Sequence, residues 1–175
     1  FVNLRFNKPG QVVKVLRFLF LVFLLNIIRY VVGGPLEAWI LMEPMHAMMP
    51  KYPEVFDTQF SNIDFAISLG YNFMFWLVAA WMYHLAHSAI KGHHVVKSLK
   101  IFGLMGLFFI SVAAVYMNHY TAEIKTFYLY SMLDAVILFP LVGLANGLLY
   151  PRIMTDGEAV ETVDSANKHG PSDEF

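Results

Sequence analysis

The sequence predicts an all-α integral membrane protein, built as a bundle of four transmembrane helices. Of its 175 residues, 58% are hydrophobic and only 14% are charged, whereas soluble domains have about 25% charged residues. Four apolar segments are each close to the ~20 residues that a helix needs to cross a bilayer. Backbone polar groups inside lipid must bond to one another, so each segment is expected to be helical.

The four predicted helices cover residues of about 12–32, 65–89, 99–117 and 127–149. The Gly-Gly-Pro sequence at residues 33–35 is predicted to end the first helix, because proline cannot continue the hydrogen-bond ladder. The segment at residues 35–42 is too short to span the bilayer and too apolar to be exposed to water. It predicts a short interfacial helix in the first outer loop, with Trp39 at the level of the lipid headgroups.

Residues 1–154 are predicted to form the four-helix transmembrane domain, followed by a polar tail at residues 155–175. The tail is acidic and lacks apolar residues for a core, so alone it would be disordered. The absence of cysteine excludes disulfides and thiolate metal sites. The formal net charge of -1 excludes a strongly basic nucleic-acid binder. The expected partners are therefore other membrane subunits and lipid.

Basic residues predict the orientation of the bundle. Lysine and arginine gather before the first helix, between the second and third, and after the fourth: Arg5, Lys8, Lys14, Arg17, Lys91, Lys97, Lys100 and Arg152. The positive-inside rule places these segments, and both termini, in the cytoplasm or its organellar equivalent. A bacterial inner membrane or an organellar inner membrane is the expected location.

An acidic residue, Asp134, lies inside the fourth apolar segment. A charge near the centre of a transmembrane helix costs about 2.5–3.5 kcal/mol on insertion scales, so Asp134 needs a partner, and Arg29 is predicted to form the ion pair. Threading the helices at ~1.5 Å per residue places polar residues from every helix in one outer-half layer. The candidate site residues of this layer are Asn26, Arg29, Tyr71, Asn72, Tyr130 and Asp134.

Two interpretations of this layer stay open. Its side chains can be interhelical hydrogen-bonding groups, each bond contributing about 0.6 kcal/mol in a membrane bundle. Alternatively, the layer is a proton path, a quinone pocket or another small-ligand site. The first interpretation explains the amide and hydroxyl groups, and explains the carboxylate of Asp134 less well.

Histidines predict a candidate metal or cofactor site at the inner end of the second helix. His84 and His87 are three residues apart and share a helix face, while His93 and His94 in the following loop can fold back towards them. Neutral imidazoles ligate iron, copper or zinc, and the centre of a haem or chlorin. The alternative is that these interfacial imidazoles contact water and lipid headgroups.

A second candidate metal site lies in the first outer loop, at Met45, His46, Met48 and Met49. Thioethers with one imidazole suit Cu(I). Methionine is also an adaptable apolar filler of interfaces. Packing against lipid or a neighbouring subunit is therefore the alternative to copper.

Close helix packing is indicated by Gly143 and Gly147, which form a GxxxG motif in the fourth helix. Such a motif lets another helix approach closely, either within this bundle or from another subunit. Gly103 and Gly106 of the third helix are candidates for the matching surface.

Motifs of soluble enzymes are absent from the sequence. The leading hypothesis is a non-catalytic subunit of a larger energy-transducing complex of the oxidoreductase type, respiratory or photosynthetic, with a structural or quinone/proton-site role. The alternative is a redox membrane protein that binds metal, haem or pigment at His84 and His87 or at the methionine segment. A small proton-coupled carrier is a third hypothesis, weakened by the lack of a visible repeat.

Overall fold

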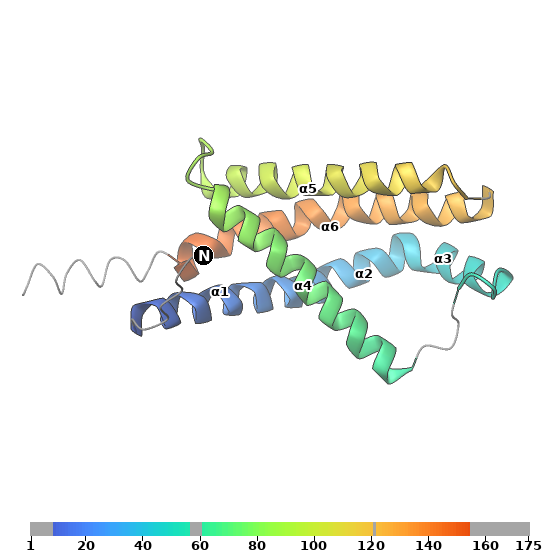
Figure 1. Cartoon of the computed structure of the whole chain (residues 1–175), viewed down its shortest axis with the longest axis horizontal. Helices are drawn as coiled ribbons and strands as arrows, with labels where there is room; N and C mark the ends of the chain where they lie inside the picture. The colour runs from blue at the N-terminus through green and yellow to red at the C-terminus, as the bar shows by residue number, and fades with distance from the viewer. Residues whose placement is uncertain (1–8, 57–60, 121, 155–175) are drawn as a thin grey trace, which may run out of the picture.

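The computed structural model describes residues 9–56, 61–120 and 122–154, and over these residues it is helical, with turns and no strand (Figure 1). The tail predicted at residues 155–175 lies outside the described residues. The elements in chain order are α1 (Pro9–Ile28), η1 (Arg29–Gly33), α2 (Gly34–Glu37), η2 (Ala38–Met42), α3 (Glu43–Met48), η3 (Met49–Lys51), α4 (Asn62–Ala86), α5 (His94–Met117) and α6 (Ala122–Met154).

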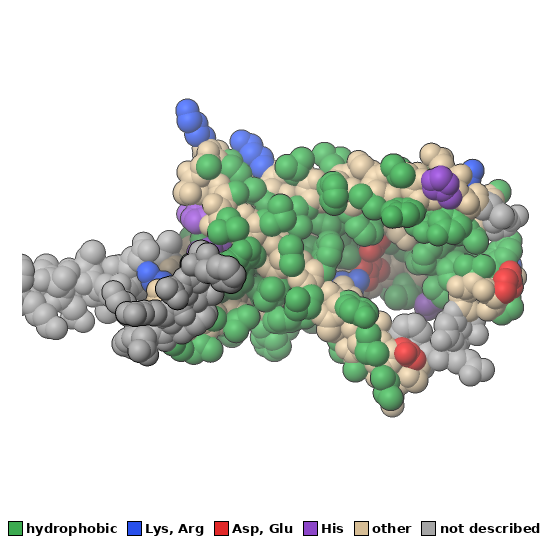
Figure 2. Space-filling view, in the orientation of Figure 1, with side chains coloured by type: hydrophobic (Ala, Val, Ile, Leu, Met, Phe, Trp, Pro, Cys, Tyr) green, Lys and Arg blue, Asp and Glu red, His purple; other side chains and the backbone are tan. Residues whose placement is uncertain are grey.

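Four helices among the described residues are long and apolar enough to cross a membrane: α1 with its continuation, α4, α5 and α6. This confirms the prediction of an all-helical chain with four spans. Figure 2 shows hydrophobic side chains covering most of the length of the bundle, as expected for a surface that faces lipid. The chain is therefore described as an integral membrane protein.

The first helix does not end at residues 33–35, so the predicted boundary is wrong. Helical backbone continues from α1 through η3, and Gly10–Lys51 forms one rod of 42 residues. Gly33 and Gly34 both have right-handed helical φ and ψ angles. Residues 35–42 consequently continue the first helix instead of forming a separate one. At ~1.5 Å per residue the rod is about 60 Å long, twice the ~30 Å hydrocarbon core.

Wide π-helical turns explain how the rod passes its prolines. In a π-turn each carbonyl bonds to the N–H five residues on, and the Gly34 N–H donates to the carbonyl of Arg29. Pro35 follows the first such segment, η1, and Pro44 follows the second, η2. A proline ring clashes with the carbonyl four residues back, and in both cases that carbonyl belongs to a π-turn. The wider turn accommodates the ring, so the helix continues.

The helices α5 and α6 lie side by side and antiparallel, and they form the most extensive helix pair (Figure 1). Gly143 and Gly147 of the predicted motif lie at this contact. A Cβ atom on Gly147 would be 2.5 Å from the Cα of Val95, and one on Gly143 would be 2.8 Å from the Cβ of Phe102. The absence of both side chains allows α6 to approach α5 closely within this chain.

The two glycines predicted on the facing helix behave differently. A Cβ on Gly106 would be 3.0 Å from Phe139, whereas one on Gly103 would have no neighbour within 4 Å. The buried amide of Asn146 also donates to the Ser98 hydroxyl at 2.9 Å across the same pair of helices.

The helix α4 crosses the other helices diagonally (Figure 1). Its buried residues all lie in the C-terminal half, namely Trp76, Ala79, Ala80 and Tyr83, and they join a core with Leu21, Leu25 and Phe102. Side chains of its N-terminal half, such as Ile63 and Phe65, are exposed. This divergence of α4 leaves space beside α6, and the candidate site occupies it.

Candidate functional site

Arg29 forms an ion pair with Glu37 inside the first helical rod. The guanidinium Nη2 donates to Glu37 Oε1 at 2.6 Å, and both side chains are largely buried. Asp134 was predicted to be the ion-pair partner of Arg29, and the partner is instead Glu37. The π-turn provides the physical reason. In a regular α-helix residue 36 would lie on the same face as Arg29, because seven residues make about two turns. A π-turn contains one extra residue, so residue 37 takes that position instead.

Asp134 of α6 lies beside this pair. Its carboxyl group is within the electrostatic reach of both Glu37 and Arg29. We call Arg29, Glu37 and Asp134 the polar centre. It contains two acids and one base, and it lies about 10 Å along α6 from Phe127, where the apolar run begins.

A close approach of α6 to the rod brings the polar centre together. A Cβ atom on Gly33 would be 2.7 Å from Leu138 Cδ2. Leu138 is four residues, one turn, after Asp134 on α6. The small residue at position 33 thus allows α6 to bring Asp134 to the ion pair.

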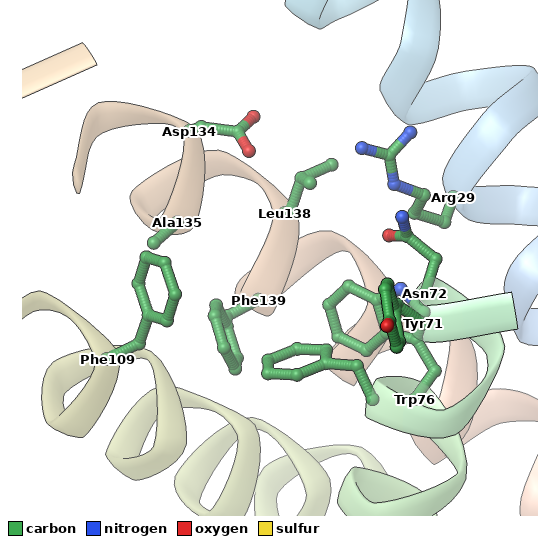
Figure 3. Close-up of a pocket in the computed structure, with 10 residues that line it drawn as sticks. Arg29, Tyr71, Asn72, Trp76, Phe109, Asp134, Ala135, Leu138 and Phe139 are labelled. Carbon is green, nitrogen blue, oxygen red and sulfur yellow. The ribbon is translucent and has the colours of Figure 1, made fainter. Parts of the chain in front are cut away.

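A cavity of about 280 Å³ opens beside the polar centre, and we call it the polar cavity. Arg29 points into it from the rod and Asp134 from α6, while the rings of Phe109, Phe139 and Trp76 form its apolar walls (Figure 3). The other lining residues are Tyr71, Asn72, Phe75, Ala135 and Leu138. In Figure 2, acidic and basic side chains are visible together in a hollow between the helices.

Three buried polar atoms of the polar cavity have no hydrogen-bond partner among the described residues. Two are donors, Arg29 Nε and Trp76 Nε1, and one is an acceptor, Asp134 Oδ1. Buried polar groups are nearly always paired, and each unpaired one costs about 1–3 kcal/mol. The polar cavity is therefore lined by residues that carry unsatisfied donors and an unsatisfied acceptor.

A second cavity of about 280 Å³ also borders the polar centre. Arg29, Glu37, Asp134 and Ser131 line it together with the apolar residues Leu41, Met42, Met45 and Phe109. Arg29 and Asp134 therefore line both cavities, whereas Glu37 lines only the second.

The remaining predicted residues of the polar layer have different roles. Asn72 lines the polar cavity, and its amide donates to the Ser68 carbonyl at 3.0 Å. Tyr71 also lines the cavity but is 73% exposed. Asn26 is buried and donates to the Val22 carbonyl at 2.9 Å. Tyr130 is half-buried on α6 and is not among the residues that line either cavity.

The predicted histidines do come together, around Tyr150 at the end of the bundle where α4 ends and α5 begins. His84 Nδ1 and the Tyr150 hydroxyl are 2.6 Å apart, and the rings of His87 and His94 lie 5.1 and 6.0 Å from the Tyr150 ring. His94 Nδ1 is 2.9 Å from the Tyr83 hydroxyl. The Val95 N–H donates to His93 Nδ1 at 3.4 Å, so His93 caps α5.

These contacts use one ring nitrogen of each histidine. Within the part of the chain that the structure describes, no group of three or more His, Asp or Glu side chains is placed to hold one metal ion. The observed arrangement is a hydrogen-bonded aromatic cluster that joins α4, α5 and α6. Metal or cofactor binding by His84, His87, His93 and His94 stays a prediction.

The methionine segment, which was predicted to lie in the first outer loop, is helical. Met45, His46 and Met48 belong to α3, and Met49 begins η3. The three methionines are half-buried and His46 is exposed, and Met45 lines the second cavity. Packing beside the polar centre is thus one role of Met45, and copper binding stays a prediction.

Two residues of the site, Glu37 and Trp76, were not predicted from the sequence. Glu37 was assigned to a separate interfacial helix because residues 33–35 were expected to end the first helix. Its carboxylate among the otherwise apolar residues 35–42 is the signal that could have identified it. Trp76 was treated as an apolar residue, although a buried indole N–H also needs a partner.

Comparisons with protein-family models, with curated proteins and with solved structures found no match to this chain.

Proposed function

We propose that this chain is a helical, non-catalytic subunit of a larger energy-transducing membrane complex of the oxidoreductase type. In this proposal the polar centre is a proton-handling site that also binds the polar head of a quinone-type ligand. One observation carries the proposal: Arg29 faces both Glu37 and Asp134 inside the spanning region, beside a cavity with unpaired polar atoms.

The bundle does not need a charged group at this depth for packing alone. Asn146 and Ser98 already join α5 to α6 with neutral groups, and the glycines allow close approach elsewhere. Ionisable residues within transmembrane segments are costly, and they typically mark proton relays or ligand sites. A site with two carboxyl groups and one guanidinium therefore favours a function over interhelical bonding alone.

The charges of the polar centre favour proton uptake. With both carboxylates ionised, Glu37 and Asp134 outweigh Arg29 and leave a net charge of one negative unit. One proton makes the centre neutral, and a neutral group is much cheaper than a charge in an apolar medium. Arg29 and Asp134 line two cavities, and in this proposal a proton enters the centre through one of them and leaves through the other.

The distribution of basic residues supports an orientation for this subunit. The first and last described residues, Pro9 and Met154, lie at the same end of the bundle (Figure 1), and Arg17 and Arg152 are near that end. The positive-inside rule places this end in the cytoplasm or its organellar equivalent. Trp39, which is exposed, then lies in the half of the rod that is nearer the opposite side of the membrane. The proposed location is a bacterial or organellar inner membrane.

Purification from native membranes through an affinity tag on this chain tests the proposal. We expect wild type to co-purify with other membrane subunits and with redox cofactors. Asp134→Asn keeps the size of the side chain and removes the charge, so assembly should persist while turnover of the complex falls about tenfold or more. Asp64→Asn is the matched control, because the carboxylate of Asp64 bonds to Ser61 at the start of α4 and does not line either cavity.

Two results would contradict the proposed function. One is a wild-type chain that purifies alone under gentle solubilisation. The other is a complex containing Asp134→Asn that turns over at the wild-type rate.

A further inference from the structure

A long apolar groove adjoins the polar cavity. It has a volume of about 670 Å³ and lies between α4 and α5. No polar side chain lines it. Its main lining residues are Val78, Met82, Leu104, Met105, Phe108 and Val112.

The groove and the polar cavity meet at two aromatic rings. Phe75 and Phe109 line both of them. Leu104 and Phe108 are largely exposed, so the groove is open along the lipid-facing side of α5. A molecule in the bilayer can therefore enter the groove sideways and reach Phe75 and Phe109, the two residues that the groove shares with the polar cavity.

The polar side chains that line the cavity define the polar head of such a molecule. Arg29 Nε–H and Trp76 Nε1–H can donate to a carbonyl oxygen, and Asp134 Oδ1 can accept from a hydroxyl. A head that carries a carbonyl in one form and a hydroxyl in the other satisfies both kinds of atom. The head should also not be anionic, because the carboxyl groups of Glu37 and Asp134 would repel a second negative group such as a carboxylate.

We propose that the polar cavity and the apolar groove together bind one quinone-type lipid. Its ring lies at Arg29, Trp76 and Asp134, and its chain lies along Val78 and Val112. This inference rests on the proposed function and adds the position of the ligand's chain. Taken together, the two volumes of about 280 and 670 Å³ fall within the range of about 300–1,000 Å³ that is typical of small-molecule sites.

Fluorescence quenching of Trp76 in the full chain, reconstituted in lipid nanodiscs, tests the inference. The chain has three tryptophans, so Trp39→Phe with Trp81→Phe leaves Trp76 as the reporter. The probe is a benzoquinone with a decyl chain, and the comparison ligand is the same ring with a methyl group in place of the chain. We expect quenching by the decyl compound to saturate, because a specific site becomes fully occupied. Collisional quenching in the bilayer would instead increase linearly with the quinone concentration.

Variants of the groove distinguish binding of the decyl chain in the groove from general partition of the compound into lipid. Val78→Phe and, independently, Val112→Phe should weaken binding of the decyl compound about tenfold, the equivalent of about two methylene groups leaving the groove. Neither should change binding of the methyl compound. Val136→Phe is the matched control, because Val136 is 56% exposed on α6 and Val78 is 49% exposed on α4.

Several results would overturn the inference. Quenching that never saturates, or equal weakening by Val136→Phe, would show that the quinone is only dissolved in lipid. If both groove variants bind the decyl compound with wild-type affinity, its decyl chain does not lie in the groove. Displacement of the quinone by an equal concentration of oleate would make the ligand an anionic lipid instead.

Failure of this inference is distinguishable from failure of the proposed function. If the groove variants bind the decyl compound normally but Asp134→Asn still lowers turnover of the complex, only the proposed position of the ligand's chain is wrong. If Asp134→Asn turns over normally, the proposed function itself is contradicted.

Discussion

Replacing Gly147 by alanine should separate the two most closely packed helices of the bundle. The added Cβ would lie 2.5 Å from Val95 Cα and 3.1 Å from the Val95 nitrogen. Both are backbone atoms, so no side-chain rotation can relieve the contact. The helices α5 and α6 must therefore move apart at this point.

The size of the effect follows from these distances. Ordinary van der Waals contact begins at 3.4 Å, so the backbones must part by about 1 Å, and a gap of that size forfeits roughly a quarter to a half of the dispersion energy of the atoms involved. Overpacking of this kind costs about 1–3 kcal/mol. We expect Gly147→Ala to lower the free energy of unfolding by about 2 kcal/mol.

Gly103→Ala is the control, because a Cβ at that position meets no atom within 4 Å. Its effect should be under about 1 kcal/mol and of opposite sign, since alanine is the better helix former. Unfolding in mixed micelles, followed by circular dichroism, measures both variants. If Gly147→Ala is as stable as Gly103→Ala, the close approach of α5 and α6 is not present.

Two further predictions concern the same bundle. In a double-mutant cycle of Ser98→Ala and Asn146→Ala, the coupling free energy should be about 0.6 kcal/mol, the average for a membrane hydrogen bond. A coupling of zero in mixed-micelle unfolding would contradict their hydrogen bond. His84→Ala with His87→Ala should lower stability through loss of the Tyr150 contacts and leave the metal content and visible spectrum unchanged. A lost metal or absorption band would instead establish the histidine cofactor site.

Four spans could be predicted from the sequence because the bilayer imposes one simple requirement, about 20 apolar residues per helix. The end of the first helix could not. Glycine and proline at residues 33–35 normally stop a helix, and only the π-turn at Arg29–Gly33 allows it to continue. Local composition does not reveal such a turn, because it forms together with the tertiary contacts of the segment.

Part of the polar centre could be predicted, because the bilayer also imposes a cost on charged groups. The cost of a buried charge identified Asp134 and Arg29 as residues that need partners. The pairing itself depends on Glu37, and its position on the rod follows from the π-turn. Trp76 was missed because its sequence neighbours are apolar. The structure shows that its ring packs against Phe102 and Phe139 while its buried N–H has no partner among the described residues.

Infrared difference spectroscopy of the carboxyl groups tests most directly whether the polar centre holds a proton. The full chain in lipid nanodiscs should show the carbonyl stretch of a protonated carboxyl group, shifted in deuterium oxide and perturbed by the decyl quinone. Asp134→Asn and Glu37→Gln should each remove this band, because one proton is shared by two acids, and Asp64→Asn should leave it in place. A wild-type spectrum without the band, or a band that survives both substitutions unchanged, would contradict a proton-handling centre at Arg29, Glu37 and Asp134.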